Sequence, residues 1–157
     1  MNIKKITKED KQFVTAVLRN FWGSDTIIVR NNSYKVETLL GFLAEENKRP
    51  VGLITYTIKN KKILIISLNS LIPGKGIGTA LLEKVQEEGK MAGYLKIIVV
   101  TTNDNIKAQE FYKKRGFIPT AMYKNSIKKA RLIKPEIPEI GENGIPITDE
   151  IELTLSL

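Results

Sequence analysis

The stretch that decides the fold runs from Asn69 to Phe117 and reads NSLIPGKGIGTALLEKVQEEGKMAGYLKIIVVTTNDNIKAQEFYKKRGF. It opens with a glycine-rich turn, PGKGIG. Apolar residues then recur every three or four positions up to Gly93, a pattern that predicts a helix with a left-handed C-cap. LKIIVVT has the composition of a buried strand, and NDN opens a second helix that ends at Gly116. Strand, turn, helix and strand in this order predict a βαβ unit with two parallel strands.

The residues before this stretch predict an edge strand, a helix and an antiparallel meander. The edge strand is expected at Asn2–Ile6, and an apolar stripe from Phe13 to Phe21 predicts a helix that ends near Gly23. A β-rich segment, TIIVR, is then interrupted by the polar run NNSYK. Short polar connectors join the three strands expected next, at Thr38–Ala44, Val51–Lys59 and Lys62–Asn69.

After the central stretch, the chain returns to extended structure. Phe117–Met122 and the closing TDEIELTLSL are expected to be strands, with one helical turn at Ala130–Leu132 between them. No repeat or linker interrupts the 157 residues, so residues 1–157 are expected to form a single domain.

Composition excludes several kinds of chemistry. The chain has no cysteine and no histidine, which removes disulfides, thiol nucleophiles, Ser-His triads and the usual zinc sites, so no metal is expected. The N-terminus MNIKKITKED lacks the apolar core of a secretory signal, and no apolar run has the length of a membrane span. A cytoplasmic protein without a membrane partner is therefore expected.

The charge is unevenly distributed. Lys and Arg number 25 against 17 Asp and Glu, a net charge of +8, yet the segment from Pro135 to Leu157 holds six acids and no basic residue. The basic body suits an anionic partner such as a phosphorylated cofactor, and the acidic end suits a cationic group. Because no arginine-rich run with interleaved aromatics is present, no nucleic-acid partner is expected.

The turn PGKGIG predicts a phosphate site. Gly74, Gly76 and Gly78 allow a tight turn with close backbone approach, and the first amides of the next helix have no partners within it. Such amides suit an anion without a metal. The segment lacks the Gly-Lys-Ser/Thr ending of a Walker A loop, and Thr79 stands where a dinucleotide fingerprint needs glycine. A tight turn without a ligand is the alternative interpretation.

Two half-motifs, separated by the expected βα unit, resemble the coenzyme A-binding core of the GNAT acetyltransferases. That family has Arg/Gln-x-x-Gly-x-Gly/Ala at the turn and Asn-x-x-Ala-x-x-Phe-Tyr-x-x-x-Gly-Phe further on. Gly76 and Gly78 match the first pattern. The second is matched by Asn105, Ala108, Phe111, Tyr112, Gly116 and Phe117. The close match covers about a third of the chain.

The resemblance implies an α/β (α+β) fold with a mixed central sheet of about six or seven strands, flanked by helices, in which a parallel pair splays apart at the cofactor site. It also implies acetyl-coenzyme A as cosubstrate. The residues that it places at the cofactor are Leu68, Asn69, Gly74, Lys75, Gly76, Ile77, Gly78, Thr79, Asn105 and Tyr112.

Two side chains carry the implied chemistry on the cofactor side. Tyr112 would stand near the thioester sulfur, where a phenol can donate a hydrogen bond to a leaving thiolate. Asn105 would bond the pantetheine arm. The plainer interpretations are a core aromatic for Tyr112 and a helix cap for Asn105.

The chain departs from the family pattern at two places. Pro73 occupies the position of the usual Arg or Gln, so Lys75 or another lysine is left to supply charge to the phosphates. The strand Ile63–Leu68 lacks the glutamate that deprotonates the amine in many relatives. Asp25, Glu37 and Asp104 are candidate bases, but Glu150 and Asp149 are preferred because the last strand usually borders the acceptor site in this family.

The function that follows is acetyl transfer to a primary amine by direct attack, with a small-molecule or peptide acceptor left open. A GNAT-fold protein that binds coenzyme A as a regulator or sensor without turnover is the second hypothesis, and a basic nucleic-acid-binding protein is the third. Monomer and homodimer both stay open, since GNAT relatives often dimerise.

Overall fold

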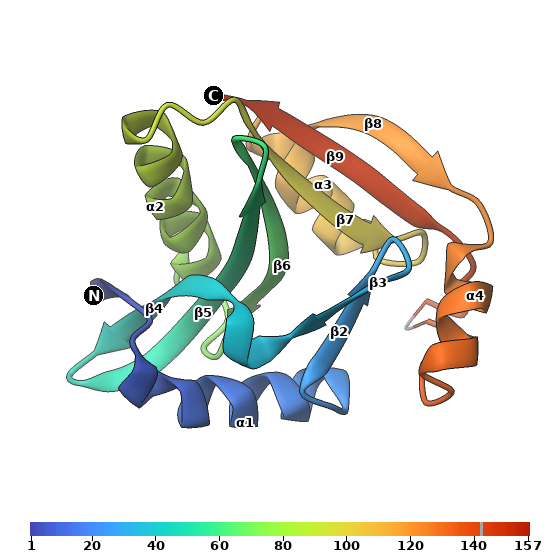
Figure 1. Ribbon diagram of the computed structural model, residues 1–157, viewed down its shortest axis with the longest axis horizontal. Coiled ribbons are helices and arrows are strands. Elements are labelled where there is room, and N and C mark those ends of the chain that lie inside the picture. Colours follow the sequence, from blue (N-terminus) through green and yellow to red (C-terminus); the bar gives the residue numbers. More distant parts are fainter. Residues whose placement is uncertain (142) are drawn as a thin grey trace. The chain divides into compact units, whose positions relative to one another are not determined.

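The computed structural model describes residues 1–141 and 143–157. The described residues form a seven-stranded sheet in the order β1-β4-β5-β6-β7-β9-β8, together with a two-stranded ribbon of β2 and β3. The sheet is mixed, includes a parallel pair, and is accompanied by four α-helices within the described ranges (Figure 1). The expected fold class is therefore confirmed.

By its contacts the chain divides into two compact units. Unit 1 comprises residues 1–27, 34–97 and 157, and unit 2 comprises residues 28–33 and 98–156. Unit 1 contains these elements: β1 (Asn2–Lys5), α1 (Lys11–Trp22), β4 (Leu40–Glu46), β5 (Arg49–Lys59), β6 (Lys62–Ser70) and α2 (Ile77–Met91). Unit 2 contains α3 (Ile106–Lys114), β8 (Ile118–Tyr123), α4 (Ser126–Ile133), β9 (Glu150–Ser156) and most of β7 (Lys96–Thr102).

In unit 1, four antiparallel strands carry helix α2. β4 pairs with β1 and β5, and β5 pairs with β6. The expected apolar face of α2 is buried against β4, β5 and β6, with Leu81, Leu82 and Val85 almost completely inaccessible. Burial of one such side chain is worth about 1.5–3 kcal/mol, so this face is what holds the helix on the sheet.

Gly52 on β5 sets how closely α2 approaches the sheet. A Cβ atom at Gly52 would collide with the Ile77 side chain and touch Leu81. Ile77, the first residue of α2, is itself 2% exposed. The start of α2 is thus held directly on β5, and the turn before it is positioned by that contact.

Two-residue turns connect the hairpins of the chain. Both polar connectors expected in the meander contain an Asn-Lys pair in the left-handed region, Asn47–Lys48 and Asn60–Lys61. Arg30–Asn31 has the same backbone, with φ values of 48° and 63°. Positive φ at both central residues is the type I′ geometry that suits the right-handed twist of a hairpin.

Among the differences from the sequence-based expectation, three change the conformation of a segment, while others shift a strand end by one or two residues. The polar run after residue 30 was expected to interrupt a strand, but Asn32–Lys35 is strand β3, which pairs with β2 (Thr26–Val29). The strand expected at Thr38 begins at Leu40, because residues Val36–Thr38 form a turn of 3₁₀ helix. Helix α4 spans eight residues in place of one turn, since Ile127 and Ala130 are buried on one face of it.

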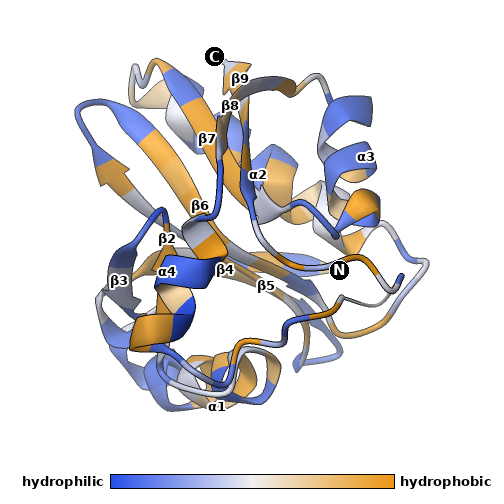
Figure 2. Cartoon of the chain, turned by 90° about the vertical axis from the view of Figure 1, so that its right-hand side faces the viewer, coloured by the Kyte–Doolittle hydropathy of each residue, from blue (hydrophilic) through white to orange (hydrophobic). Residues whose placement is uncertain are grey.

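In unit 2, α3 contacts β9, and β8 pairs antiparallel with β9 (Figure 1). Leu153 of β9 and Phe117, just before β8, are almost completely buried and form part of its core. Hydrophobic and hydrophilic residues are interspersed along α4, and likewise along α1 of unit 1 (Figure 2). This pattern is expected for a helix with one covered face.

Candidate functional site

The glycine-rich turn in unit 1 has the backbone that the sequence predicts for an anion site. Gly74 and Gly76 adopt φ values of 79° and 68°, and a Cβ atom at either would meet nothing within 4 Å. These glycines are therefore needed for their left-handed backbone and not for packing space. Residues 72–76 are exposed, Pro73 and Lys75 among them, so the turn is open to a ligand.

Helix α2 begins without a side-chain cap. Gly76 is its N-cap, and the Ala80 N–H donates to the Gly76 carbonyl at 3.0 Å. The amides of Ile77 and Gly78 come before the first full turn and have no carbonyl partner inside the helix. The first turn, which includes Thr79, holds no acidic residue. The positive end of a 15-residue helix dipole thus lies at an open glycine turn, which is favourable for a phosphate.

The end of β6 leads into this turn. Leu68 and Asn69 pair with Ile54 and Leu53 of β5. The Oδ1 atom of Asn69 is buried and has no hydrogen-bond partner among the described residues. A buried amide oxygen without a partner is costly, and a bound donor removes that cost. Asn69 is consistent with the predicted contact to a cofactor.

A bulge in β6, which sequence reasoning missed, lies just before Leu68. Thr55 pairs with Ser67 and Tyr56 pairs with Ile65, so Ile66 is an extra residue. The hydroxyls of Thr55 and Ser67 are buried and hydrogen-bonded at 2.5 Å. Bulges are over-represented next to active sites because they redirect a strand. A run such as ILIISL carries no glycine or polar break that would signal it.

In unit 2, helix α3 positions Asn105 and Tyr112. Asn105 is the N-cap, and its Oδ1 accepts the Ala108 N–H at 3.1 Å, so the capping role is confirmed. Its side-chain NH₂ is the group that a ligand can use. Tyr112 lies seven residues further on, which places both on one side of the helix, about 10 Å apart along its axis.

Tyr112 is 6% exposed and its ring makes edge contacts with Phe111 and Phe117. Burial raises the pKa of the Tyr112 phenol well above its ordinary value, and nearby Arg115 opposes this to a smaller extent. The phenol therefore stays protonated at neutral pH and is a hydrogen-bond donor. The packing fits the core-aromatic interpretation as well as the catalytic one.

The two preferred carboxylates differ in how deeply they are buried. Asp149 accepts the Asn125 N–H at 2.8 Å through Oδ1. Its backbone N–H donates to Asn103 Oδ1, and its carbonyl accepts the Asn103 N–H. Glu150 is 4% exposed. Its Oε2 accepts the Arg30 N–H at 3.1 Å, but its Oε1 is buried with no partner in the described chain. Each carboxylate thus accepts one hydrogen bond, and Glu150 differs from the half-buried Asp149 in that its second oxygen is enclosed without a partner in the described residues.

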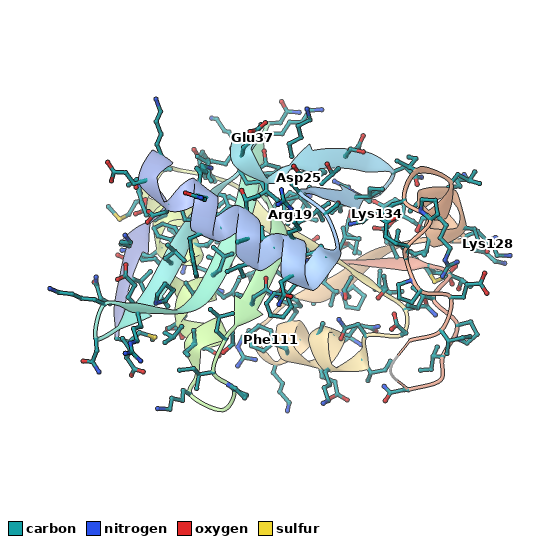
Figure 3. The ribbon with its side chains drawn as sticks, turned by 90° about the horizontal axis from the view of Figure 1, so that it is seen from below. Arg19, Asp25, Glu37, Phe111, Lys128 and Lys134 are labelled. Atoms are coloured by element: carbon teal, nitrogen blue, oxygen red, sulfur yellow. The ribbon has the colours of Figure 1, made fainter. Side chains whose placement is uncertain are left out.

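The other candidate bases are less suitable, with one exception. Asp25 and Glu37 lie on the surface of unit 1, where Asp25 is paired with Arg19 at the end of α1 (Figure 3). Asp104, beside Gly141, resembles Glu150 in that its Oδ1 is buried without a partner in the described residues. Asp104 thus stays an alternative.

The sequence analysis did not identify Arg30 and Glu152. Both lie beside Glu150, and the Arg30 N–H and the Glu150 carboxylate are 120 positions apart in the chain. Alternation in the last strand could have pointed to Glu152, since residues 150 and 152 share one face of a strand. Nothing in the sequence connects Arg30 to them.

Within residues 1–141 and 143–157, no helix has both the length and the apolar character needed to cross a membrane. The same residues contain no cluster of three or more acidic side chains suited to a metal ion.

Comparisons with known proteins were made by sequence and by structure. Residues 7–117 match the family described as Acetyltransferase (GNAT) family. YdhI of Bacillus subtilis is 46% identical over 142 residues, covering 90% of this chain and 89% of that protein. YxbD of the same organism is 40% identical over 158 residues, covering 100% and 99%.

Among solved structures, an IAA acetyltransferase from Bacillus cereus aligns with a TM-score of 0.75 at 24% identity, covering 99% of each chain. A GNAT family acetyltransferase from Elizabethkingia anophelis, with acetyl-CoA bound, has a TM-score of 0.72 at 24% identity and covers 99% of this chain and 97% of its own. These structures establish the fold, and the family match spans most of the chain. The chain belongs to the GNAT family of acetyltransferases.

Proposed function

We propose that this protein is an acetyl-coenzyme A-dependent N-acetyltransferase that acts on a primary amine. The observation that carries the proposal is the open glycine turn at the start of α2, with left-handed Gly74 and Gly76 and a helix end that has no side-chain cap. Residues 1–157 act as one GNAT domain in this proposal, in the cytoplasm and without a metal. The solved relative with acetyl-CoA bound supports the choice of cosubstrate.

The residues of the turn fit the phosphates of the cosubstrate. Amides from Gly74 to Thr79 hold the pyrophosphate, and Lys75 supplies positive charge in place of the family's Arg or Gln. Leu68, Asn69 and the Asn105 NH₂ bind the pantetheine arm. Asn69 supports this assignment best, because its buried Oδ1 has no partner among the described residues. When bound, the cosubstrate supplies the acetyl group as a thioester.

The acceptor amine has to lose a proton before it attacks, since an ammonium has no lone pair. We assign this proton to Glu150. Its carboxylate is held by the Arg30 N–H on one oxygen, while the other oxygen has unfilled capacity. Asp149 contributes by holding the Asn125 amide at the turn before α4. The Tyr112 phenol, which is protonated at neutral pH, donates a hydrogen bond to the sulfur that leaves.

The test compares Glu150→Gln with wild type in acetyl transfer from acetyl-coenzyme A to a panel of primary amines. Glutamine keeps an acceptor for the Arg30 N–H but cannot take a proton. We expect kcat to fall about 10²- to 10⁴-fold, the usual size of general base catalysis, with acetyl-coenzyme A affinity unchanged. Glu139→Gln, an exposed acid of the same unit, is the matched control.

Three outcomes would change the proposal. Transfer by Glu150→Gln at the wild-type rate would remove Glu150 from the mechanism, and loss of transfer in Asp104→Asn alone would move the role to Asp104. Acetyl-coenzyme A binding by wild type without transfer to any amine would favour the second hypothesis, a regulatory or sensory binding protein.

A further inference from the structure

The tip of the β2–β3 hairpin lies against β9 in unit 2. The tip consists of Arg30 and Asn31, whose positive φ values form the two-residue turn. The turns Asn47–Lys48 and Asn60–Lys61 have the same left-handed backbone, so Arg30 is distinguished by its contacts and not by its conformation.

Arg30 binds two carboxylates by two different groups. Its backbone N–H donates to Glu150 Oε2 at 3.1 Å, and its guanidinium Nη1 donates to Glu152 Oε2 at 3.1 Å. The guanidinium also reaches the Tyr123 hydroxyl at 3.4 Å and lies 5.8 Å from the centre of its ring. We call Arg30, Tyr123, Glu150 and Glu152 the Arg30 cluster.

Within the Arg30 cluster, the carboxylate of Glu152 is fully engaged. Its Oε1 accepts from the Thr120 hydroxyl at 2.7 Å, and its Oε2 accepts from the Tyr123 hydroxyl at 2.8 Å as well as from Arg30. The Arg30 and Glu152 side chains are 30% and 13% exposed, so solvent screens their ion pair only in part. Glu152 anchors the guanidinium.

Glu150 differs from Glu152 although it shares its face of β9, two residues away. It is the more deeply buried of the two, and only one of its oxygens has a partner in the described residues. If the cluster only stabilised the fold, the positive guanidinium would be expected on the carboxylate that has an unpartnered oxygen, which is Glu150. It lies on the other carboxylate, which leaves one buried acceptor for a cationic group.

We propose that Arg30 is a positioning residue that holds Glu150 through its peptide N–H while its guanidinium is anchored on Glu152, so that Glu150 Oε1 receives a primary ammonium. This proposal rests on the assignment of Glu150 as the proton acceptor. The ligand that fits is a single ammonium head, because Glu152 is paired with the Arg30 guanidinium and one buried oxygen of Glu150 has no partner in the described residues.

The test uses Arg30→Gly, with Asn31→Gly as its matched control. Glycine relieves left-handed strain at both positions and keeps both peptide N–H groups, and only the first variant loses the guanidinium. We expect Arg30→Gly to lower kcat/KM for the amine at least tenfold, with acetyl-coenzyme A affinity within twofold of wild type. Asn31→Gly stays within twofold in both.

Two further measurements separate positioning from simple stabilisation. Millimolar guanidinium ion is expected to restore transfer by Arg30→Gly and to leave Asn31→Gly and Glu150→Gln unchanged. The double variant that combines Arg30→Gly with Glu152→Gln should have the same kcat/KM as Arg30→Gly alone, because Arg30 and Glu152 act through one ion pair.

A binding experiment decides the proposal independently of turnover. Titration of the wild-type protein with n-butylammonium should move the NMR signal of the Arg30 amide in a saturable way. The shift should vanish in Glu150→Gln and need at least fivefold more ligand in Arg30→Gly. Saturable binding without any acetyl transfer would refute the proposed function and retain the role of Arg30. The absence of binding, or equal behaviour of the two glycine variants, would refute the role of Arg30.

Discussion

The replacement of Gly76 by alanine provides a sharp test of the anion site, because helix α2 supplies its own control. Gly76 precedes the first residue of α2 with φ 68°, and Gly93 follows its last turn with φ 75°. A Cβ atom at either position would meet nothing within 4 Å. Alanine therefore brings no collision at either end, only the cost of left-handed backbone, about 1–2 kcal/mol.

Gly76→Ala and Gly93→Ala should thus lower the free energy of unfolding by similar amounts. Urea titrations measure this loss, and the dependence of the free energy on urea concentration (the m-value) should not change. Their affinities for acetyl-coenzyme A should differ. If the turn relaxes to relieve the strain at residue 76, the amides of Ile77 and Gly78 are displaced from the phosphates. Each such contact is worth up to about 2 kcal/mol when partly buried. The dissociation constant should rise about 5- to 30-fold, and that of Gly93→Ala should not change.

Isothermal titration calorimetry of each variant with acetyl-coenzyme A measures this difference directly. Wild-type affinity in Gly76→Ala, at a confirmed loss of stability, would show that the turn does not bind the phosphates. Equal weakening in both variants would show that α2 responds as a whole and that the start of the helix has no special part in binding.

Two further predictions concern α3. Tyr112→Phe should lower kcat about tenfold, the value of one hydrogen bond of ~1.4 kcal/mol, with the acetyl-coenzyme A dissociation constant unchanged; an unaltered kcat would leave Tyr112 a core aromatic. Because burial raises the Tyr112 pKa in the folded state, the unfolded chain loses its phenolic proton first, so stability should fall as pH rises above about 10. Urea titrations at pH 9 and pH 11 should show a smaller fall in Tyr112→Phe, which keeps the contribution of Tyr56, a phenol whose pKa is also raised by burial. Asn105→Ala removes the cap on the Ala108 N–H and should cost about 0.5–2 kcal/mol of stability, whereas Asn105→Ser keeps a capping oxygen. If the Asn105 NH₂ also binds the cosubstrate, calorimetry should show weaker binding in Asn105→Ser at near wild-type stability, and unchanged binding would restrict Asn105 to capping.

Sequence reasoning was most successful where structure depends on local backbone preference. The left-handed glycines at the turn before α2, the Gly93 and Gly116 positions after α2 and α3, and the Asn105 cap are all found as expected. Each depends on the conformational freedom of one residue or on hydrogen bonds within four residues of it. The amphipathic face of α2 was also correct, since it needs only the helical period.

Local reasoning failed where a segment's conformation depends on distant partners. β3 was not predicted because its residues, NSYK, lack the apolar alternation that marks a strand. Helix α4 is longer than its sequence suggests, as Ile127 and Ala130 are buried by the fold. The bulge at Ile66 is likewise a matter of register between β5 and β6.

By itself the sequence determined the family pattern, the turn that suits a phosphate and the short list of carboxylates on the last strand. Only the tertiary structure distinguished between Glu150 and Asp149, by burying Glu150 with one oxygen unpartnered in the described residues and leaving Asp149 half-buried. The reason is physical. Backbone conformation is set largely by a residue and its near neighbours, whereas burial and hydrogen-bond supply depend on what folding brings from far along the chain, here an arginine 120 positions away.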